Sequence, residues 1–111
     1  MSQPSDLPSV AVTDVGDDAT ILDVREPDEW EAGHAPGAVH IPLGDLPARV
    51  AELPEGAPLP VVCRSGGRSG RAVQWLQQQG VDVANLEGGM RAWHAAGKAM
   101  VSGTGADPAV K

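Results

Sequence analysis

The chain has 111 residues, 41% of them hydrophobic, so its length and composition indicate one compact domain with its own core. No apolar run approaches the roughly 20 residues that cross a bilayer, so we expect no membrane partner. The net charge of −7 argues against the basic surface that binds nucleic acid, so we expect no nucleic-acid partner either.

Cys63 is the one cysteine of the chain, which excludes an internal disulfide and a zinc site built on paired thiolates. The first eight residues lack the basic and apolar regions of a secretory signal. We therefore expect a cytoplasmic protein with no bound metal and no cofactor.

The charge is distributed unevenly along the chain. Residues 1–52 hold eleven acidic residues against two arginines, a net charge of −9, whereas residues 53–111 have a net charge of +2. Three arginines, Arg64, Arg68 and Arg71, follow closely after Cys63. This local excess of positive charge is the first indication of a functional site.

Short strands and helices are predicted to alternate along the chain, because glycines and prolines divide it into short apolar segments. This alternation predicts an α/β fold, with a parallel sheet flanked by helices. The expected strands cover residues 10–12, 20–24, 38–41, 60–63 and 81–86. The expected helices run from Pro27 to Gly33, over 44–53, over 68–79 with Gly80 as a left-handed cap, and over 90–96.

The domain is expected to occupy residues 8–98. Residues 1–7 are interpreted as an N-terminal extension. Residues 99–111 are rich in Gly, Ala and Pro, which predicts a loosely held C-terminal tail.

The strongest motif is the loop at residues 63–69, which reads Cys-Arg-Ser-Gly-Gly-Arg-Ser between a predicted strand and a predicted helix. The adjacent Gly66 and Gly67 allow successive N–H groups to point inward, forming an anion nest beside the helix N-terminus. Such a setting lowers the pKa of a thiol, so Cys63 is expected to be a reactive thiolate rather than an inert core residue.

The side chains of this loop have different expected roles. Arg68 is expected to fold back over the loop and hold an anionic group, and Ser69 to donate to the thiolate. Arg64 either is solvated or attracts anionic donors, whereas Arg71 is expected to be an ordinary surface charge. The expected substrate-binding residues are Arg64, Ser65, Gly66, Gly67, Arg68 and Ser69.

The sequence resembles the rhodanese homology domain, specifically its small single-domain sulfurtransferases, in three blocks and in their order and separation. The first block is Leu-Asp-Val-Arg-Glu at residues 22–26, and the second is Gly-His-Ala-Pro-Gly-Ala-Val-His-Ile-Pro at residues 33–42. The third joins the cysteine loop to Leu-Glu-Gly-Gly-Met-Arg-Ala-Trp at residues 86–93. The resemblance covers about residues 8 to 98.

The resemblance implies a five-stranded, mostly parallel sheet flanked by helices, and a thiosulfate sulfurtransferase that carries a sulfane sulfur as a Cys63 persulfide. The implied partners are a small sulfur donor such as thiosulfate and a thiol or cyanide acceptor. A protein donor or acceptor is a further expectation. Asp23 and Arg25, which end the second predicted strand, are expected to support the loop in a buried polar network.

Two alternatives stay open at this point. The domain could serve as a persulfide carrier or docking module for a protein partner. The same family also contains cysteine phosphatases and arsenate reductases, but the phosphatases place the loop arginine one position later than Arg68, which leaves more room for a tetrahedral oxyanion.

The chain departs from the family pattern between Val12 and Thr20, where only seven residues stand in place of a helix that the family often inserts. One face of the sheet is therefore expected to be thinly covered. Either an apolar patch is exposed there for dimerisation or docking, or a loop or the C-terminal tail folds over it.

Overall fold

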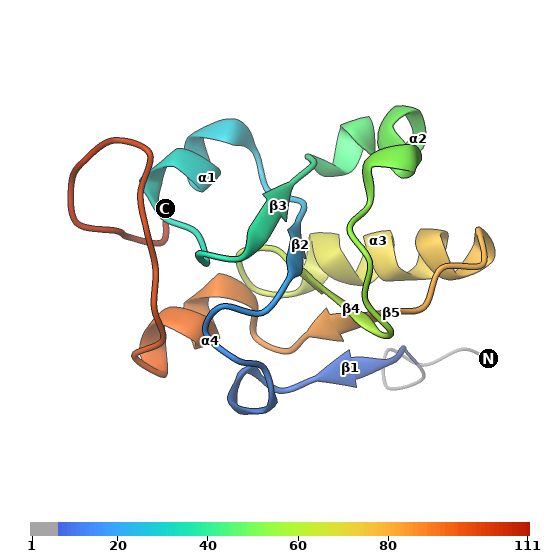
Figure 1. The fold of residues 1–111 in the computed structure, drawn as a ribbon, viewed down its shortest axis with the longest axis horizontal. Coiled ribbons are helices and arrows are strands. Elements are labelled where there is room, and N and C mark those ends of the chain that lie inside the picture. The colour runs from blue at the N-terminus through green and yellow to red at the C-terminus, as the bar shows by residue number, and fades with distance from the viewer. Residues whose placement is uncertain (1–6) are drawn as a thin grey trace.

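The computed structural model describes residues 7–111, which form a five-stranded sheet with helices packed on both faces (Figure 1). All strand pairs are parallel, and the strands lie in the order β1-β5-β4-β2-β3, which confirms the predicted α/β fold. The expected extension at residues 1–7 lies, except for Leu7, outside the described residues. The strands are β1 (Ser9–Val10), β2 (Ile21–Asp23), β3 (Ala38–His40), β4 (Leu59–Val62) and β5 (Val83–Leu86).

Four α-helices and three short 3-10 turns connect the strands. The predicted helix over 44–53 is instead a four-residue α-helix between two 3-10 turns, because Gly44 and Pro47 are poor helix formers in a segment too short to propagate a helix. The helices are α1 (Pro27–Ala32), α2 (Leu46–Arg49), α3 (Gly67–Gln78) and α4 (Gly89–Ala95), and the 3-10 turns are Val12–Asp14, Leu43–Asp45 and Val50–Glu52.

The last predicted strand begins two residues later than expected. The N–H of Val81 donates to the carbonyl of Leu76 at 3.0 Å, so Val81 closes the end of α3 instead of opening β5. Gly80 has a φ of +81°, the left-handed conformation predicted for it. The later start of β5 is therefore explained by the helix-ending motif at Gly80 and Val81.

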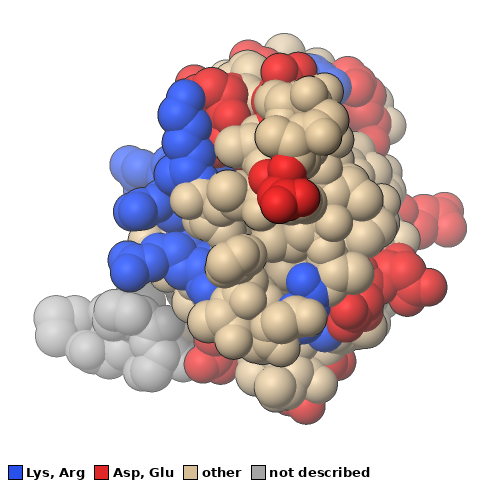
Figure 2. All heavy atoms as spheres, turned by 90° about the vertical axis from the view of Figure 1, so that its left-hand side faces the viewer, with Lys and Arg blue, Asp and Glu red and all other residues tan. Residues whose placement is uncertain are grey.

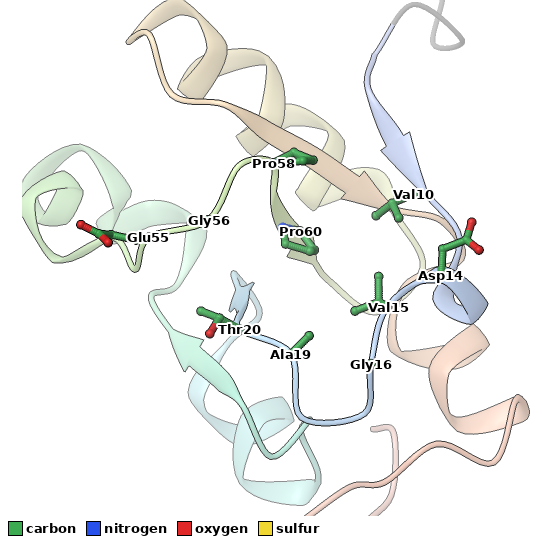
Figure 3. Close-up of a pocket in the computed structure, with 10 residues that line it drawn as sticks. All are labelled: Val10, Asp14, Val15, Gly16, Ala19, Thr20, Glu55, Gly56, Pro58 and Pro60. Atoms are coloured by element: carbon green, nitrogen blue, oxygen red, sulfur yellow. The ribbon is translucent and has the colours of Figure 1, made fainter.

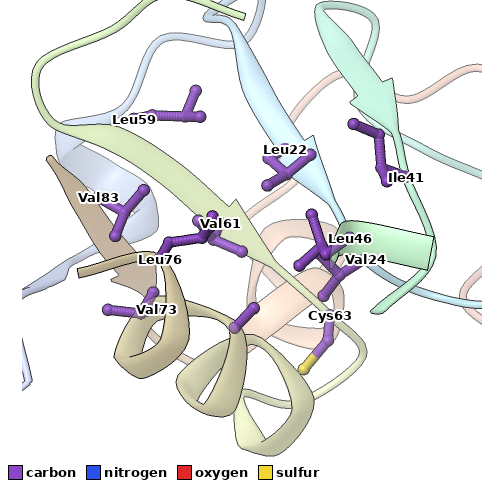
Figure 4. Packing of buried hydrophobic residues seen from close by; sticks show 11 residues of the cluster. Leu22, Val24, Ile41, Leu46, Leu59, Val61, Cys63, Val73, Leu76 and Val83 are labelled. Carbon is purple, nitrogen blue, oxygen red and sulfur yellow. The ribbon is translucent and has the colours of Figure 1, made fainter. Parts of the chain in front are cut away.

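The core has two layers, one on each face of the sheet. Figure 4 shows the layer between the sheet and α3, in which Cys63 lies at the end of β4 with its sulfur toward the first turn of α3. The other layer is centred on Trp93 and Met90 of α4, and both side chains are fully buried. The sheet therefore holds Cys63 at its carboxyl edge, where open α/β sheets bind ligands.

The C-terminal tail has more contacts than its composition predicts. Val101 and His34 exchange two main-chain hydrogen bonds of 2.9 Å, and the N–H of Ala109 donates to Ala32 at 2.9 Å. A Cβ on Gly33 would lie 2.5 Å from the carbonyl of Ala109, so the tail needs glycine at that position to approach α1 this closely. The structure thus places the tail against α1.

The face expected to be thinly covered is covered only in part. Val12 and Val15 are buried beside α4, and Met100 and Val110 of the tail also pack on this layer. An open hollow of about 390 Å³ remains on this face, beside the amino ends of β2 and β4 and the end of β1, between residues 10–20 and 55–60 (Figure 3). Among residues 7–111, no helix is long and apolar enough to span a membrane.

Candidate active site

The cysteine loop is fixed by the start of α4 as well as by its own strand and helix. The N–H groups of Met90 and Arg91 donate to the carbonyls of Cys63 and Arg64 at 2.8 and 3.0 Å. Gly89 has a φ of +61°, and a Cβ there would lie 2.5 Å from the carbonyl of Cys63. The Gly-Gly-Met-Arg motif therefore lets α4 lie directly against the loop backbone.

The sulfur of Cys63 accepts hydrogen bonds from the loop that surrounds it. The N–H of Gly66 donates to Sγ at 3.0 Å, and the hydroxyl of Ser69 lies 3.3 Å from Sγ. Gly66 has a φ of +121°, which residues with a side chain rarely adopt. In this conformation its N–H points toward the sulfur of Cys63. Cys63 itself is only 1% exposed, so its sulfur lies at the base of the loop.

These contacts change the acidity of the thiol. Burial raises the pKa of the Cys63 thiol, because it disfavours the charged form. Hydrogen bonds from the Ser69 hydroxyl and from the N–H groups of Ser69, Gly66 and Ser65 lower it, and together they outweigh burial. The pKa of Cys63 therefore lies below that of an ordinary cysteine, which favours the nucleophilic thiolate.

Asn85 of β5 is a supporting residue that the sequence analysis did not identify. Its Oδ1 lies 2.6 Å from the Ser69 hydroxyl, and its Nδ2 donates to the carbonyl of Gly66 at 3.2 Å. A hydroxyl has one proton, so Ser69 donates at any moment mainly to one of three acceptors: Oδ1 of Asn85, the carbonyl of Gly66 or the sulfur. Asn85 thus holds both Gly66 and Ser69 in position while it competes for the Ser69 proton.

Arg68 is not folded freely over the loop as expected, because Glu29 of α1 binds it. The two side chains form a bidentate pair with N–O distances of 2.6 and 2.8 Å. The pair holds the pKa of Glu29 below its usual range and raises that of Arg68. Glu29 also accepts a hydrogen bond from the main chain of Glu26 as part of the α1 capping box.

The remaining loop residues lie at the surface. Arg64, Ser65 and Gly67 are exposed, and Nε of Arg64 donates to the main-chain oxygen of Lys111 at 3.0 Å. The other guanidinium nitrogens of Arg64 have no protein partner among the described residues. Arg64 is therefore the loop arginine with free donors.

Asp23 and Arg25 form a fully buried ion pair, with 2.7 Å between Oδ2 of Asp23 and Nη2 of Arg25. The same nitrogen donates to the carbonyl of Gly33 at 2.7 Å. His40 donates from Nε2 to the carbonyl of Arg25, also at 2.7 Å. These contacts join β2 to the end of α1 and to β3, and none of these hydrogen bonds reaches a residue of the cysteine loop.

The structure thus brings Cys63, Gly66 and Ser69 together and leaves Arg68 held by a residue from another helix. Two supporting residues were missed, and each has a sequence signal. Glu29 is the third residue of a helix that starts at Pro27, the position of a capping-box acid. Asn85 is the one polar residue in the otherwise apolar β5.

Comparisons with known proteins identify the family of the chain. Residues 10–96 match the Rhodanese-like domain family. A "Sulfurtransferase" of Allochromatium vinosum is 38% identical over 90 residues, which cover 80% of this chain and 84% of that protein. The crystal structure of a rhodanese-related protein from Thermoplasma volcanium is 31% identical with a TM-score of 0.77, covering 85% of this chain and 97% of that one.

A relative in Bacillus subtilis, named "Putative sulfur carrier protein YrkF", is 44% identical over 81 residues, 72% of this chain. This chain spans 44% of the length of that relative and 60% of the length of YqhL, another protein of the same organism. The family match covers most of the present chain and includes the whole cysteine loop. The chain therefore belongs to the Rhodanese-like domain family, which contains sulfurtransferases and sulfur carriers.

Proposed function

We propose that the protein is a sulfurtransferase that carries a sulfane sulfur as a persulfide on Cys63. The observation that carries this proposal is the convergence of loop N–H groups and the Ser69 hydroxyl on Sγ of Cys63, which stabilises a sulfur anion at that atom. Relatives named as a sulfurtransferase and a sulfur carrier support it. A reactive thiolate of this kind suits a reducing compartment such as the cytoplasm.

In the first step, the Cys63 thiolate attacks the outer sulfur of a donor such as thiosulfate. A bond forms between the two sulfurs, the sulfur–sulfur bond of thiosulfate breaks, and sulfite leaves with the electron pair. The free donors of Arg64 and the loop N–H groups hold the departing anion. Arg68 contributes to this step only when the anion replaces its partner Glu29.

In the second step, an acceptor such as cyanide or a thiol attacks the outer sulfur of the persulfide. The new bond forms to the acceptor, the bond to Cys63 breaks, and the electron pair returns to Cys63 as a thiolate. No general base is needed once the acceptor is ionised. Asp23 and Arg25 therefore have a supporting role in this proposal, through the position of β2 and α1.

Intact mass after incubation with thiosulfate tests the proposal. We expect the mass of one added sulfur atom, its loss on treatment with cyanide, and no addition to Cys63→Ala. If incubation with both thiosulfate and a persulfide donor adds no sulfur to the protein, the result contradicts the proposal.

A persulfide carrier for a protein partner is a second candidate, favoured by the carrier name of the relative YrkF and by the burial of Cys63. The two candidates differ in kinetics. Slow turnover with thiosulfate and cyanide, together with fast sulfur uptake from a cysteine desulfurase, would favour the carrier. Fast turnover with the two small molecules would favour the enzyme.

A further inference from the structure

The basic side chains of the protein fall into two groups. Of its eight lysines and arginines, five lie within 4 Å of an Asp or Glu carboxylate, and three have no Asp or Glu partner among residues 7–111. The five paired residues are Arg25, Arg49, Arg68, Lys98 and Lys111. The three without an Asp or Glu partner are Arg64, Arg71 and Arg91, and all three are exposed. Only Nε of Arg64 is engaged within the described part of the chain, by the main-chain oxygen of Lys111.

These three arginines lie on the elements that surround the cysteine loop. Arg64 follows Cys63 directly, and the N–H of Arg91 at the start of α4 donates to the carbonyl of Arg64. Arg71 lies on α3, one turn after Arg68. Figure 2 shows several Lys and Arg side chains along one edge of the molecule, with a few others elsewhere on this face, which carries most of its Asp and Glu side chains away from that edge.

This arrangement exceeds what a small donor needs. A sulfonate group is held by one guanidinium fork and a few N–H groups, which Arg64 and the loop supply. Arg71 and Arg91 lie outside the loop, so their charges can attract a ligand that is larger than the loop. A protein partner with acidic residues is attracted to this edge and repelled elsewhere, because the chain as a whole has a net charge of −7.

We propose that Arg64, Arg71 and Arg91 form a docking surface for an acidic protein segment that carries the acceptor thiol. The burial of Cys63 requires an acceptor that protrudes into the loop, such as a cysteine on a projecting segment. This inference rests on the proposed function. Its step is the same transfer: the acceptor thiolate bonds to the outer sulfur, the bond to Cys63 breaks, and Cys63 leaves as a thiolate.

Two synthetic peptides provide the test. Each contains one cysteine, flanked in one peptide by Asp and Glu and in the other by Ser and Gln. Transfer from the sulfur-loaded protein is followed in a single turnover at low salt. We expect the acidic peptide to react about tenfold faster, with an advantage that decreases as salt is added.

The double variant Arg71→Gln/Arg91→Gln removes two side-chain charges but keeps the main chain, so the hydrogen bond from the N–H of residue 91 to the carbonyl of Arg64 is retained. It should lose the advantage of the acidic peptide while its rate with the neutral peptide stays unchanged. Arg49→Gln, which removes an exposed arginine paired with Glu52, is the matched control and should keep the advantage. Equal rates with the two peptides, or an equal loss with both in the double variant, would overturn the docking surface.

A binding measurement separates this inference from the proposed function. Peptides with serine in place of cysteine are tested by fluorescence anisotropy against the unloaded protein, where no sulfur transfer is involved. We expect tighter binding of the acidic peptide and its loss in the double variant, even if the loading experiment fails. As a competitor, a single-stranded oligonucleotide is added at the same concentration of negative charges as the acidic peptide. If it displaces the peptide, the assignment to a protein partner is overturned.

Discussion

The two ends of the sheet differ in what they offer to a ligand. At the carboxyl end, N–H groups and a hydroxyl converge on one sulfur atom, and the cysteine that carries it is almost fully buried. Beside the amino ends of β2 and β4, the hollow of about 390 Å³ between Val10, Val15 and Pro60 is open, and its lining is mostly apolar (Figure 3). In the proposed function the chemistry lies where the donors converge and not at the larger hollow, because only the converging donors stabilise a sulfur anion.

The largest expected effect comes from Gly89→Ala. The new Cβ would meet the carbonyl of Cys63 at 2.5 Å and would also occupy a φ of +61°. We expect a loss of about 2–4 kcal/mol of unfolding free energy and a loss of sulfur loading. Chemical denaturation and intact mass measure the two quantities.

Gly97→Ala is the matched control for this change, because Gly97 has a similar φ of +72° but open space around it. It should cost about 1 kcal/mol and leave sulfur loading unchanged. Equal losses of loading in the two variants would show that α4 does not hold the loop in place.

Glu29→Gln should have the next largest effect. It removes the carboxylate that binds Arg68, which we expect to cost about 2 kcal/mol of stability at neutral pH. The pKa of Glu29 is lowered in the folded protein, so its stabilisation is present above the unfolded pKa and is lost as pH falls through the folded pKa. The stability difference between the two proteins should therefore shrink in acid, which denaturation curves over a pH series would measure.

Glu31→Gln on the same helix is the control, since Glu31 is exposed and has no ion pair among the described residues. It should change stability by less than about 0.5 kcal/mol at any pH. A pH-independent loss in Glu29→Gln would show that packing of Glu29, and not its charge, stabilises the pair.

Ser69→Ala should shift the reactivity of Cys63 with a smaller effect on stability. Loss of a hydrogen-bond donor to the thiolate raises the pKa of Cys63, so alkylation by iodoacetamide should slow several-fold at neutral pH and recover at alkaline pH. Ser65→Ala is the matched control, because the contribution of Ser65 comes from its main-chain N–H. An unchanged pH profile in Ser69→Ala would mean that its hydroxyl donates to Asn85 or Gly66 and not to the sulfur.

The smallest effect is expected at the amino end of the sheet. Thr20 lines the hollow and is exposed, so Thr20→Val should change stability by less than about 0.5 kcal/mol and leave the rate of sulfur loading unchanged. A slower loading reaction would contradict the contrast between the two ends, because it would connect the hollow to the chemistry at Cys63.

The sequence predicted the parts of the molecule that depend on neighbouring residues. Strands β2, β3 and β4, α3 with its Gly80 cap, and the nest around Cys63 follow from contiguous patterns. The first strand was predicted over 10–12 but is Ser9–Val10, because Val12 begins a 3-10 turn. Partners that are distant in sequence were missed, such as Glu29 with Arg68 and Asn85 with Ser69, because only the sheet topology brings them together. The contacts of the tail with α1 were missed for the same reason.

The account depends most on the stabilisation of a sulfur anion at Cys63. Titration of the unmodified protein, followed by the ultraviolet absorbance of the thiolate, measures this directly because Cys63 is the only cysteine. We predict a midpoint below the value of about 8.5 for a free cysteine. A midpoint at or above that value would contradict the account, because burial would then outweigh the hydrogen bonds of the loop.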